Sequence, residues 1–323
     1  MATFSFQFDL ENADDDGAES SQDMKVRSPC ANAADATAAA PFAWVPNLEA
    51  LLLDRREEKL VYIEVLLGGR GNDVGDGEED KKKESSCPIR YVDLTQSSYQ
   101  KQPADEEATA DEDRTRSSAW RDTDIQPGVY EGGRKVWECS WDLLHFLHKQ
   151  PLEGIQRAWE MGCGHGLPGC YVLQRCPQAH VSFTDYNEDV VLDATLSNIV
   201  LNTQVDDDAP EEVRTSSFAR VQVGFGDWLD MPVSPSTRFD LILAAETMYT
   251  TKAAIDTCEL LDRHLVSPTG VAFVATKRYY FGVGGGVDAF RDACAGKLEI
   301  ETVQVLDCGV GNIREILRVS KPT

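Results

Sequence analysis

Residues 159–169, which read WEMGCGHGLPG, decide the fold of this 323-residue chain. The apolar run 157–161 leads into three glycines at alternate positions, Gly162, Gly164 and Gly166, and a second apolar stretch follows. Alternate glycines let the backbone adopt positive φ and let a ligand approach it closely. A helix that begins directly after such a turn offers unpaired N–H groups to the ligand. The stretch therefore predicts a buried strand that turns sharply into a helix beside a ligand site.

Two classes of cofactor bind at a turn of this kind. A dinucleotide needs the pattern G-x-G-x-x-G, which fits only the late glycines Gly164, Gly166 and Gly169. S-adenosylmethionine needs an acid followed by G-x-G-x-G, which is met by Glu160 and the glycines that begin at Gly162. Because the second pattern begins where the strand ends, we favour S-adenosylmethionine. A nicotinamide cofactor is the alternative.

The chain is strongly acidic, with a formal net charge of -24 at pH 7. This charge argues against a nucleic-acid backbone or an anionic membrane as the main partner, and it suits a basic protein substrate. A solvated acidic surface explains the charge equally well, and the acidic excess of residues 1–121 equals that of the rest of the chain. We expect a monomer that binds neither nucleic acid nor membrane directly.

The nine cysteines include no C-x-x-C pair and no His/Cys cluster, so we expect no metal site. We also find no signal peptide and no apolar run of about 18 residues. The cysteines are therefore expected to be free thiols in a reducing compartment. That compartment is the cytoplasm, the nucleus or both, with the nucleolus as one nuclear location.

Residues 1–121 are expected to form an acidic and mostly flexible extension. Segments 68–86 and 96–118 are rich in Gly, Asp, Glu and Lys and lack the apolar area that an ordered core needs. Residues 44–67 regain apolar side chains and predict a helix followed by a strand, as one small structured patch. We expect residues 1–118 to be dispensable for folding and for cofactor binding.

From residue 122 to 323 the pattern alternates between strands and helices. This alternation, closed by a hairpin, predicts an α/β doubly wound, Rossmann-like sheet of seven mostly parallel strands with a C-terminal antiparallel hairpin. The predicted strands are 157–161, 180–184, 220–223, 239–245, 270–276, 298–306 and 313–319, and the predicted helices are 136–148, 167–176, 190–201, 252–265 and 287–295.

Polar residues follow the predicted strands, at the edge where such sheets bind their ligands. Asp185 ends the second strand, where an acid can bind ribose hydroxyls, although a helix N-cap would look the same. Asp227 and Trp228 follow the third strand and could hold an adenine ring, with a turn acid and a core tryptophan as the alternative. Trp137, on the helix that leads into the site, is either a cofactor contact or core.

Several short motifs recur together in one known family: YEGG at 130–133, VWEC at 136–139, GCG at 162–164, DYN at 185–187, GDW at 226–228, ETMY at 246–249 and KRYYFGVGGG at 277–286. From about residue 129 onward the chain resembles the protein-histidine methyltransferases that modify a large-subunit ribosomal protein, within the seven-strand class I methyltransferases. The last motif is the most specific one. Glu160 stands where Asp is commoner, and Pro168 stands at the helix start, where it is benign.

The resemblance implies S-adenosylmethionine as the cofactor and a basic protein, in particular a large-subunit ribosomal protein, as the substrate. The loop after the fifth strand opens on the same edge as the cofactor, and its glycines suit a loop that closes over a peptide, so we expect the substrate at Tyr279, Tyr280, Phe281, Gly284 and Gly285. A flexible connector is the alternative. The residues expected to bind the cofactor are Val136, Trp137, Glu138, Cys139, Ser140, Glu160, Gly162, Cys163, Gly164, Gly166, Asp185, Tyr186, Asn187, Gly226, Asp227, Trp228 and Ala245.

Glu246 and Tyr249 are the expected catalytic residues. Methyl transfer requires a lone pair placed against the methyl group, and a neutral imidazole has one near pH 7 because its reference pKa is about 6.5. A carboxylate that accepts a hydrogen bond from one ring N–H leaves the other nitrogen, here the tele nitrogen, free to attack.

A lysine acceptor is second, because it must first lose a proton from a pKa of about 10.4. Related lysine methyltransferases are expected to have Asp-x-x-Tyr where this chain has Glu-x-x-Tyr, from Glu246 to Tyr249. A nicotinamide-dependent oxidoreductase and a binding protein that keeps the methyltransferase fold without catalysis are the remaining alternatives.

Overall fold

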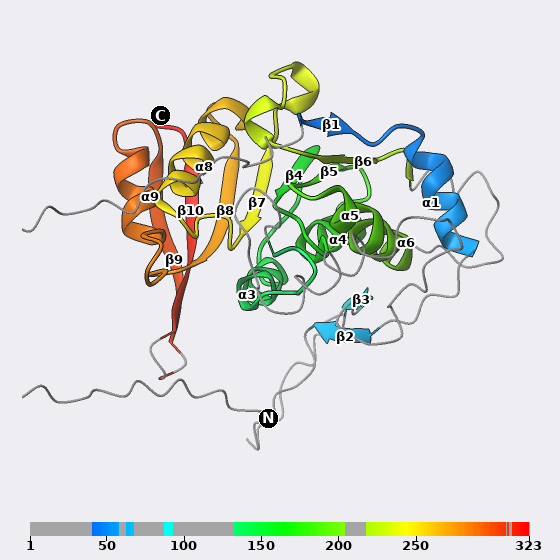
Figure 1. Ribbon diagram of the computed structural model, residues 1–323, viewed down its shortest axis with the longest axis horizontal. Helices are drawn as coiled ribbons and strands as arrows, with labels where there is room; N and C mark the ends of the chain where they lie inside the picture. The colour runs from blue at the N-terminus through cyan, green and yellow to red at the C-terminus, as the bar shows by residue number, and fades with distance from the viewer. Residues whose placement is uncertain are drawn as a thin grey trace, which may run out of the picture. The chain divides into compact units, whose positions relative to one another are not determined.

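The computed structural model describes residues 41–57, 63–67, 87–92, 132–203, 218–307, 309 and 312–322. Eight of the strands form one sheet in the order β1-β6-β5-β4-β7-β8-β10-β9 (Figure 1). These strands are β1 (Ala43–Trp44), β4 (Arg157–Met161), β5 (His180–Asp185), β6 (Val221–Phe225), β7 (Leu241–Ala245), β8 (Val271–Lys277), β9 (Glu299–Asp307) and β10 (Ile313–Ser320).

The five central strands, β4 to β8, run parallel to one another. The last two strands form an antiparallel hairpin, in which β10 pairs with both β8 and β9. The predicted seven strands and their hairpin are therefore confirmed. The eighth strand, β1, pairs antiparallel with β6 and was not predicted, because two residues are too few to show a strand pattern.

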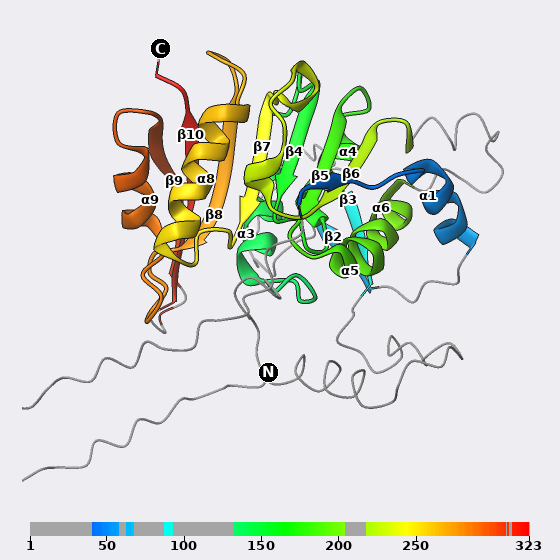
Figure 2. The same cartoon turned by 45° about the horizontal axis from the view of Figure 1, so that its top comes forward.

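Two separate buried clusters lie on the two faces of this sheet, since successive residues of a strand point to opposite faces. On β4, Ala158 belongs to the cluster under α3, α4 and α6, whereas Trp159 and Met161 belong to the cluster under α8 and α9. Figure 2 shows these helices along the sheet. The helices are α3 (Glu138–Leu147), α4 (Leu167–Arg175), α5 (Glu188–Val190), α6 (Leu196–Thr203), α8 (Thr251–His264) and α9 (Val287–Cys294), with the short helical segments η2 (Val191–Thr195), η3 (Trp228–Asp230) and η4 (Pro235–Thr237).

Part of the expected N-terminal extension belongs to the folded core. The predicted helix and strand of residues 44–67 are present as α1 (Leu48–Glu57) and β2 (Ile63–Leu67), and β2 pairs with a further strand, β3 (Cys87–Tyr91). Leu52, Leu67 and Ile89 are fully buried in the same cluster as the helices of the main sheet. The described residues of 41–57, 63–67 and 87–92 therefore pack with the main sheet, although they precede the predicted boundary at residue 121.

Side-chain amides on α6 and α4 attach β3 to the core. Asn202 accepts a hydrogen bond from the Arg90 N–H at 3.0 Å and donates one to the Arg90 carbonyl at 2.6 Å. Asn198 accepts one from the Val92 N–H at 2.7 Å, and Gln174 donates one to the Pro88 carbonyl at 3.2 Å. The backbone of alternate residues of this short strand is thus paired with helices, as buried peptide groups require.

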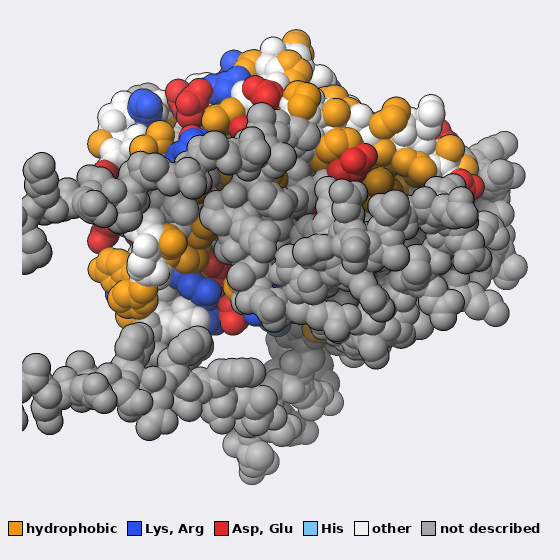
Figure 3. Space-filling view, in the orientation of Figure 1, with side chains coloured by type: hydrophobic (Ala, Val, Ile, Leu, Met, Phe, Trp, Pro, Cys, Tyr) orange, Lys and Arg blue, Asp and Glu red, His pale blue; other side chains and the backbone are white. Residues whose placement is uncertain are grey.

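The charged side chains are dispersed among the described residues. On the face shown in Figure 3, acidic and basic side chains stand between hydrophobic ones. Within the described part of the chain, no three His, Cys, Asp or Glu side chains lie close enough together to hold a metal ion. None of its helices is both long and apolar enough to cross a membrane.

Candidate active site

A cavity of about 640 Å³ opens at the carboxyl edge of the parallel strands. Residues after β4, β5, β6 and β7 form its walls together with the start of α3, as expected for an open α/β sheet. Of the residues expected to bind the cofactor, those that line the cavity are Val136, Trp137, Ser140, Gly162, Cys163, Gly164, Gly166, Asp185, Tyr186, Asp227, Trp228 and Ala245.

The glycine turn between β4 and α4 has the conformation that its sequence predicts. Gly162, Gly164 and Gly166 have φ angles of 63°, 50° and 69°, a region that side chains rarely adopt. Space is also limited, since a Cβ on Gly162 would lie 2.9 Å from a methyl carbon of Thr247 and 3.1 Å from the ring of Trp228. The backbone of the turn is therefore a wall of the cavity that no side chain can occupy.

Asp185 lies against this turn. Its carboxyl group accepts hydrogen bonds from the N–H of Gly164 at 2.8 Å and from that of Asn187 at 3.2 Å. Burial raises the pKa of Asp185 to about 6, although these two hydrogen bonds oppose the increase. The residue thus braces the turn and lines the cavity at the same time, while its predicted ribose contact stays a prediction.

Glu160 lies behind the turn and not on the cavity wall. It is 3% exposed and accepts a hydrogen bond from the Gly169 N–H at 2.7 Å, at the start of α4. Burial raises its pKa to about 8, so the carboxyl group is neutral near pH 7. The acid before the glycines holds the helix start in place, while its expected contact with the cofactor stays a prediction.

Four other residues expected to bind the cofactor also lie outside the cavity lining. Gly226 follows β6, and Asn187 lies just beyond β5. Neither residue lines the cavity, although their neighbours Asp227 and Tyr186 do. Glu138 and Cys139, at the start of α3, lie next to the acceptor end of the cavity, since the Glu138 carboxylate is 3.9 Å from the Lys277 ammonium and the charge of Glu246 raises the pKa of the Cys139 thiol. The expected cofactor contacts of these four residues, Glu138, Cys139, Asn187 and Gly226, stay predictions.

Asp227 and Trp228 stand at the end of β6, on the far side of the cavity from α3. The Asp227 carboxylate accepts a hydrogen bond from the Leu229 N–H at 3.0 Å and caps the turn η3, which is the structural alternative raised from the sequence. The Trp228 indole nitrogen and the Thr247 hydroxyl are buried and have no hydrogen-bond partner within the described residues. These two polar atoms are placed to meet a bound molecule.

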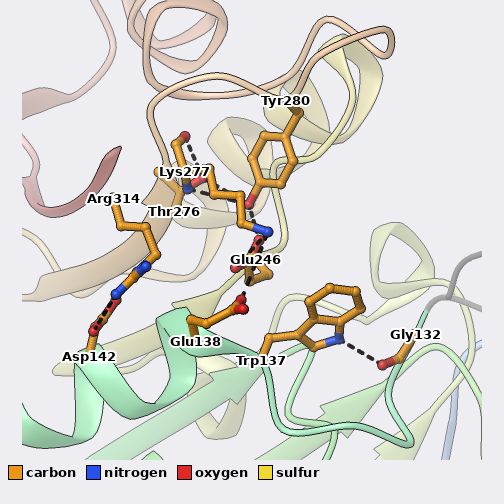
Figure 4. A network of polar contacts seen from close by, with 9 residues as sticks. All are labelled: Gly132, Trp137, Glu138, Asp142, Glu246, Thr276, Lys277, Tyr280 and Arg314. Atoms are coloured by element: carbon orange, nitrogen blue, oxygen red, sulfur yellow. Dashed lines mark hydrogen bonds and ion pairs between the residues drawn. The ribbon is translucent and has the colours of Figure 1, made fainter. Parts of the chain in front are cut away.

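Glu246 directly follows β7 and is held in an unusual position. Its φ of 57° is one of two positive values among the described non-glycine residues. Such left-handed backbone is uncommon outside glycine and often marks functional sites. The side chain, 9% exposed, accepts a hydrogen bond from the Tyr280 hydroxyl through Oε2, and its Oε1 lies 3.7 Å from the Lys277 ammonium (Figure 4). Oε1 accepts no hydrogen bond from the described residues.

The loop after β8 brings Tyr280 to this carboxylate and presents its other side chains outward. Phe281 is 89% exposed, Tyr279 and Val283 are each about half exposed, and Val283 lines the cavity. Tyr249, the second expected catalytic residue, lines the cavity as well.

The glycines of this loop pack against neighbouring segments of the chain. Gly285 packs on the chain's own backbone, where a Cβ would lie 2.2 Å from the Met248 carbonyl. The Gly284 carbonyl accepts a hydrogen bond from the Thr251 hydroxyl at 3.0 Å, and the Gly286 N–H bonds to the Met248 carbonyl at 2.9 Å. These contacts attach the loop to the segment after Glu246, while the expected contact of Gly284 and Gly285 with substrate stays a prediction.

The sequence patterns missed several residues of the cavity wall. The sequence points to Lys277, because it is the first residue of the most specific motif of the chain. Its contact with Glu246, 31 residues earlier, cannot be read from that motif. Thr247 lies inside the ETMY motif and could have been found there. The other missed wall residues, on segments without a motif, include Leu229, Thr250, Lys252, Ala253 and Asp256.

The cavity fits S-adenosylmethionine. Its volume lies within the range of about 300–1,000 Å³ that small-molecule sites have, and a few polar groups interrupt a mainly apolar wall. The glycine turn can approach a cofactor closely, and Asp185, Trp228 and Thr247 supply polar atoms at separate points of the wall. The strand order, the glycine turn and this cavity define the class I methyltransferase fold with S-adenosylmethionine as its cofactor.

The chain is similar to several known proteins. Residues 124–281 match a family model described as lysine methyltransferase. A solved TehB-like S-adenosylmethionine-dependent methyltransferase from Corynebacterium glutamicum is 18% identical, with a TM-score of 0.37, over 65% of this chain and 96% of that one.

Within the class, the chain is similar to histidine protein methyltransferases, which confirms the resemblance drawn from its motifs. It is 35% identical to the histidine protein methyltransferase 1 homolog of Dictyostelium discoideum, over 61% of this chain and 60% of that protein. It is 33% identical to the homolog of Mus musculus, over 58% of this chain and 57% of that protein. The chain thus spans about three fifths of the length of the curated relatives it matches.

Proposed function

We propose that the chain is a protein-histidine methyltransferase that transfers a methyl group from S-adenosylmethionine to the tele nitrogen of a histidine in a protein. The observation that carries the proposal is Glu246 Oε1, a buried carboxylate oxygen at the cavity that accepts no hydrogen bond from the described residues. The Lys277 ammonium lies 3.7 Å away, beyond hydrogen-bond distance, so this oxygen can still accept a hydrogen bond from a donor that the substrate brings.

The cofactor, when bound, supplies an electrophilic methyl group on a sulfonium. In the proposed site the glycine turn from Gly162 to Gly166, Asp185 and Trp228 would hold this cofactor, with Asp185 as an acceptor for ribose hydroxyls and Trp228 as an apolar surface for the adenine.

Glu246 orients the acceptor imidazole. The ring Nδ1–H donates to Glu246 Oε1, which fixes the neutral tautomer whose lone pair is on Nε2, the tele nitrogen. That lone pair forms the new N–C bond as the bond from the methyl carbon to sulfur breaks, and the imidazole takes up the positive charge. The carboxylate stabilises this charge and can accept the Nδ1 proton. The Tyr280 hydroxyl holds Glu246 in place throughout.

A lysine acceptor is the second candidate, because the matching family model is described as lysine methyltransferase. The curated relatives are named for histidine, and an ammonium must lose a proton before it can attack. These two points place histidine first.

The substrate is proposed to be a large-subunit ribosomal protein. The net charge of -24 favours a basic partner, and the exposed side chains of Tyr279, Phe281 and Val283 offer an apolar contact beside the cavity. We place the protein in the cytoplasm, the nucleus or both, acting as a monomer.

The test is incubation of the purified chain with labelled S-adenosylmethionine and large-subunit ribosomal proteins, followed by acid hydrolysis and amino-acid analysis. We expect tele-methylhistidine as the labelled product. Methyl-lysine as the only labelled product would establish the second candidate. Mass spectrometry of the cofactor bound to the purified protein distinguishes both methyltransferase candidates from an oxidoreductase. A bound nicotinamide dinucleotide would contradict methyl transfer.

A further inference from the structure

Lys277 is a largely buried cation at the acceptor end of the cavity, and the proposed mechanism does not use it. It is the last residue of β8, and its side chain is 22% exposed. Its ammonium lies 3.7 Å from Glu246 Oε1 and 3.9 Å from Glu138 Oε2 (Figure 4). The Lys277 ammonium is therefore the nearest compensating charge to the carboxylate oxygen that would accept the imidazole N–H.

Two aromatic rings limit where this ammonium can move. It lies 5.4 Å from the centroid of the Trp137 ring and 5.7 Å from that of Tyr280. Both distances are within the range of cation–π attraction, about 6 Å. Carboxylates and ring faces together therefore hold the charge at a defined place, which a mobile surface lysine would not have.

The other ionisable groups around Glu246 do not duplicate this charge. On α3, burial and the charge of Glu246 raise the pKa of the Cys139 thiol, and on the loop after β8 they raise that of the Tyr280 phenol, so both groups are neutral near pH 7. Asp142 of α3 is paired with Arg314 of β10 at 2.5 Å. Glu138 is half exposed and so partly screened by solvent.

The balance of charge matters because methyl transfer needs a neutral imidazole. A carboxylate beside an imidazole favours the protonated ring and raises its pKa, whereas a nearby cation has the opposite effect. An imidazolium carries protons on both nitrogens and has no lone pair with which to attack. A site with Glu246 alone would thus tend to trap the acceptor in its unreactive form.

We propose that Lys277 is a positioning residue that balances the Glu246 carboxylate, so that the site holds the acceptor histidine as a neutral ring with its tele nitrogen free. The inference rests on the proposed function and adds that the site selects the neutral form of the acceptor imidazole.

The test is the pH dependence of methylhistidine formation in single turnovers, with enzyme in excess over large-subunit ribosomal proteins and S-adenosylmethionine saturating. Under these conditions the rate reports ionisations within the complex. For the wild-type chain the rate should rise with pH through about 6.5, the reference pKa of imidazole. Lys277→Met should move this rise upward by about one pH unit, because the uncompensated carboxylate stabilises the imidazolium. Lys277→Arg, which keeps the charge, should restore the wild-type profile.

Lys321→Met is the matched control, because Lys321 pairs with Asp262 at 3.6 Å and does not line the cavity. Its profile should equal that of the wild type. Binding of S-adenosylhomocysteine verifies that each variant is folded, and Lys277→Gln replaces Lys277→Met if the latter does not bind.

The inference would be overturned if Lys277→Met lowered the rate without shifting the pH profile. It would also be overturned if Lys277→Arg shifted the pH profile as far as Lys277→Met does. Absence of methylhistidine with the wild-type chain would contradict the proposed function itself, and the inference with it.

Discussion

Asp185 accepts a hydrogen bond from the glycine turn and is predicted to bind the ribose of the cofactor. Its ionisation should therefore change the affinity for the cofactor, which can be measured. Burial raises the pKa of this carboxyl group to about 6 in the free protein. Ribose hydroxyls would donate to the ionised form and so lower its pKa on binding. An acid whose pKa falls on binding loses affinity for its ligand as the pH falls through the free value, here about 6.

Calorimetric titration with S-adenosylhomocysteine should therefore show affinity falling about tenfold between pH 7 and pH 5, with proton release near pH 6. Asp185→Asn should bind more weakly and lose this pH dependence. An affinity of the wild-type protein that stays constant over this interval would remove the ribose role.

Tyr280 should matter for turnover and not for the cofactor. Its hydroxyl donates to Glu246, and burial, followed by the charge of Glu246, raises its pKa so that it remains a donor at neutral pH. Tyr280→Phe removes one hydrogen bond to a charged group, which is worth about 1.5–3 kcal/mol, or roughly 10- to 100-fold in rate. We expect kcat for methylhistidine formation to fall by this factor, with the affinity for S-adenosylhomocysteine unchanged. Parallel losses in both quantities would place Tyr280 in the cofactor pocket instead.

At the scale of elements, α6 connects the N-terminal strand β3 with the glycine turn. Asn198 and Asn202 lie one helical turn apart and both bind the backbone of residues 90–92. Only Asn198 also donates to the His165 carbonyl inside the turn, at 2.8 Å.

Alanine substitution of each asparagine should lower the free energy of unfolding by about 1–3 kcal/mol, because buried backbone groups lose their partners. Only Asn198→Ala should in addition weaken cofactor binding several-fold. Thr203→Ala is the control, since the Thr203 hydroxyl bonds within its own helix, to the Ile199 carbonyl. Denaturant unfolding and calorimetry measure the two effects. Equal cofactor affinity in the two asparagine variants would show that β3 and the turn are not coupled through α6.

Local patterns predict the central elements well and long-range contacts poorly. Strand β4 has the predicted bounds and the glycines have the predicted positive φ, because both follow from neighbouring residues. The same patterns cannot show that Glu160 turns inward to the Gly169 N–H. They also miss β1 in the sheet, and the meeting of Lys277 and Tyr280 with Glu246, since these depend on which strands lie side by side. Motifs of a family locate such residues without revealing what they contact.

At the scale of the whole molecule, the extent of the folded unit changes the expectation for truncation. A chain that begins at residue 41 keeps all the described elements, whereas one that begins at residue 119 loses β1, α1, β2 and β3. The second truncation removes the fully buried side chains of Leu52, Ile89 and Val92, each worth about 1.5–3 kcal/mol of burial.

We therefore expect the chain from residue 41 to match the full chain in melting temperature and cofactor affinity. The chain from residue 119 should be insoluble, or its melting temperature should lie well below that of the full chain. Thermal unfolding with and without S-adenosylhomocysteine measures both properties. A chain from residue 119 with full stability would restore the view that residues 1–118 are dispensable.

Glu246→Gln offers the most direct test of the central claim, that Glu246 orients a histidine acceptor beside a bound cofactor. The variant keeps the size of the side chain and removes its charge, so the imidazolium that forms loses its stabilising partner. Tele-methylhistidine formation on large-subunit ribosomal proteins should fall at least about 100-fold relative to the wild type, as expected for loss of a positioned general base. Affinity for S-adenosylhomocysteine should stay within about twofold, because the glycine turn and Asp185 are untouched. Wild-type rates in Glu246→Gln, or a loss of cofactor binding in parallel with activity, would contradict the claim.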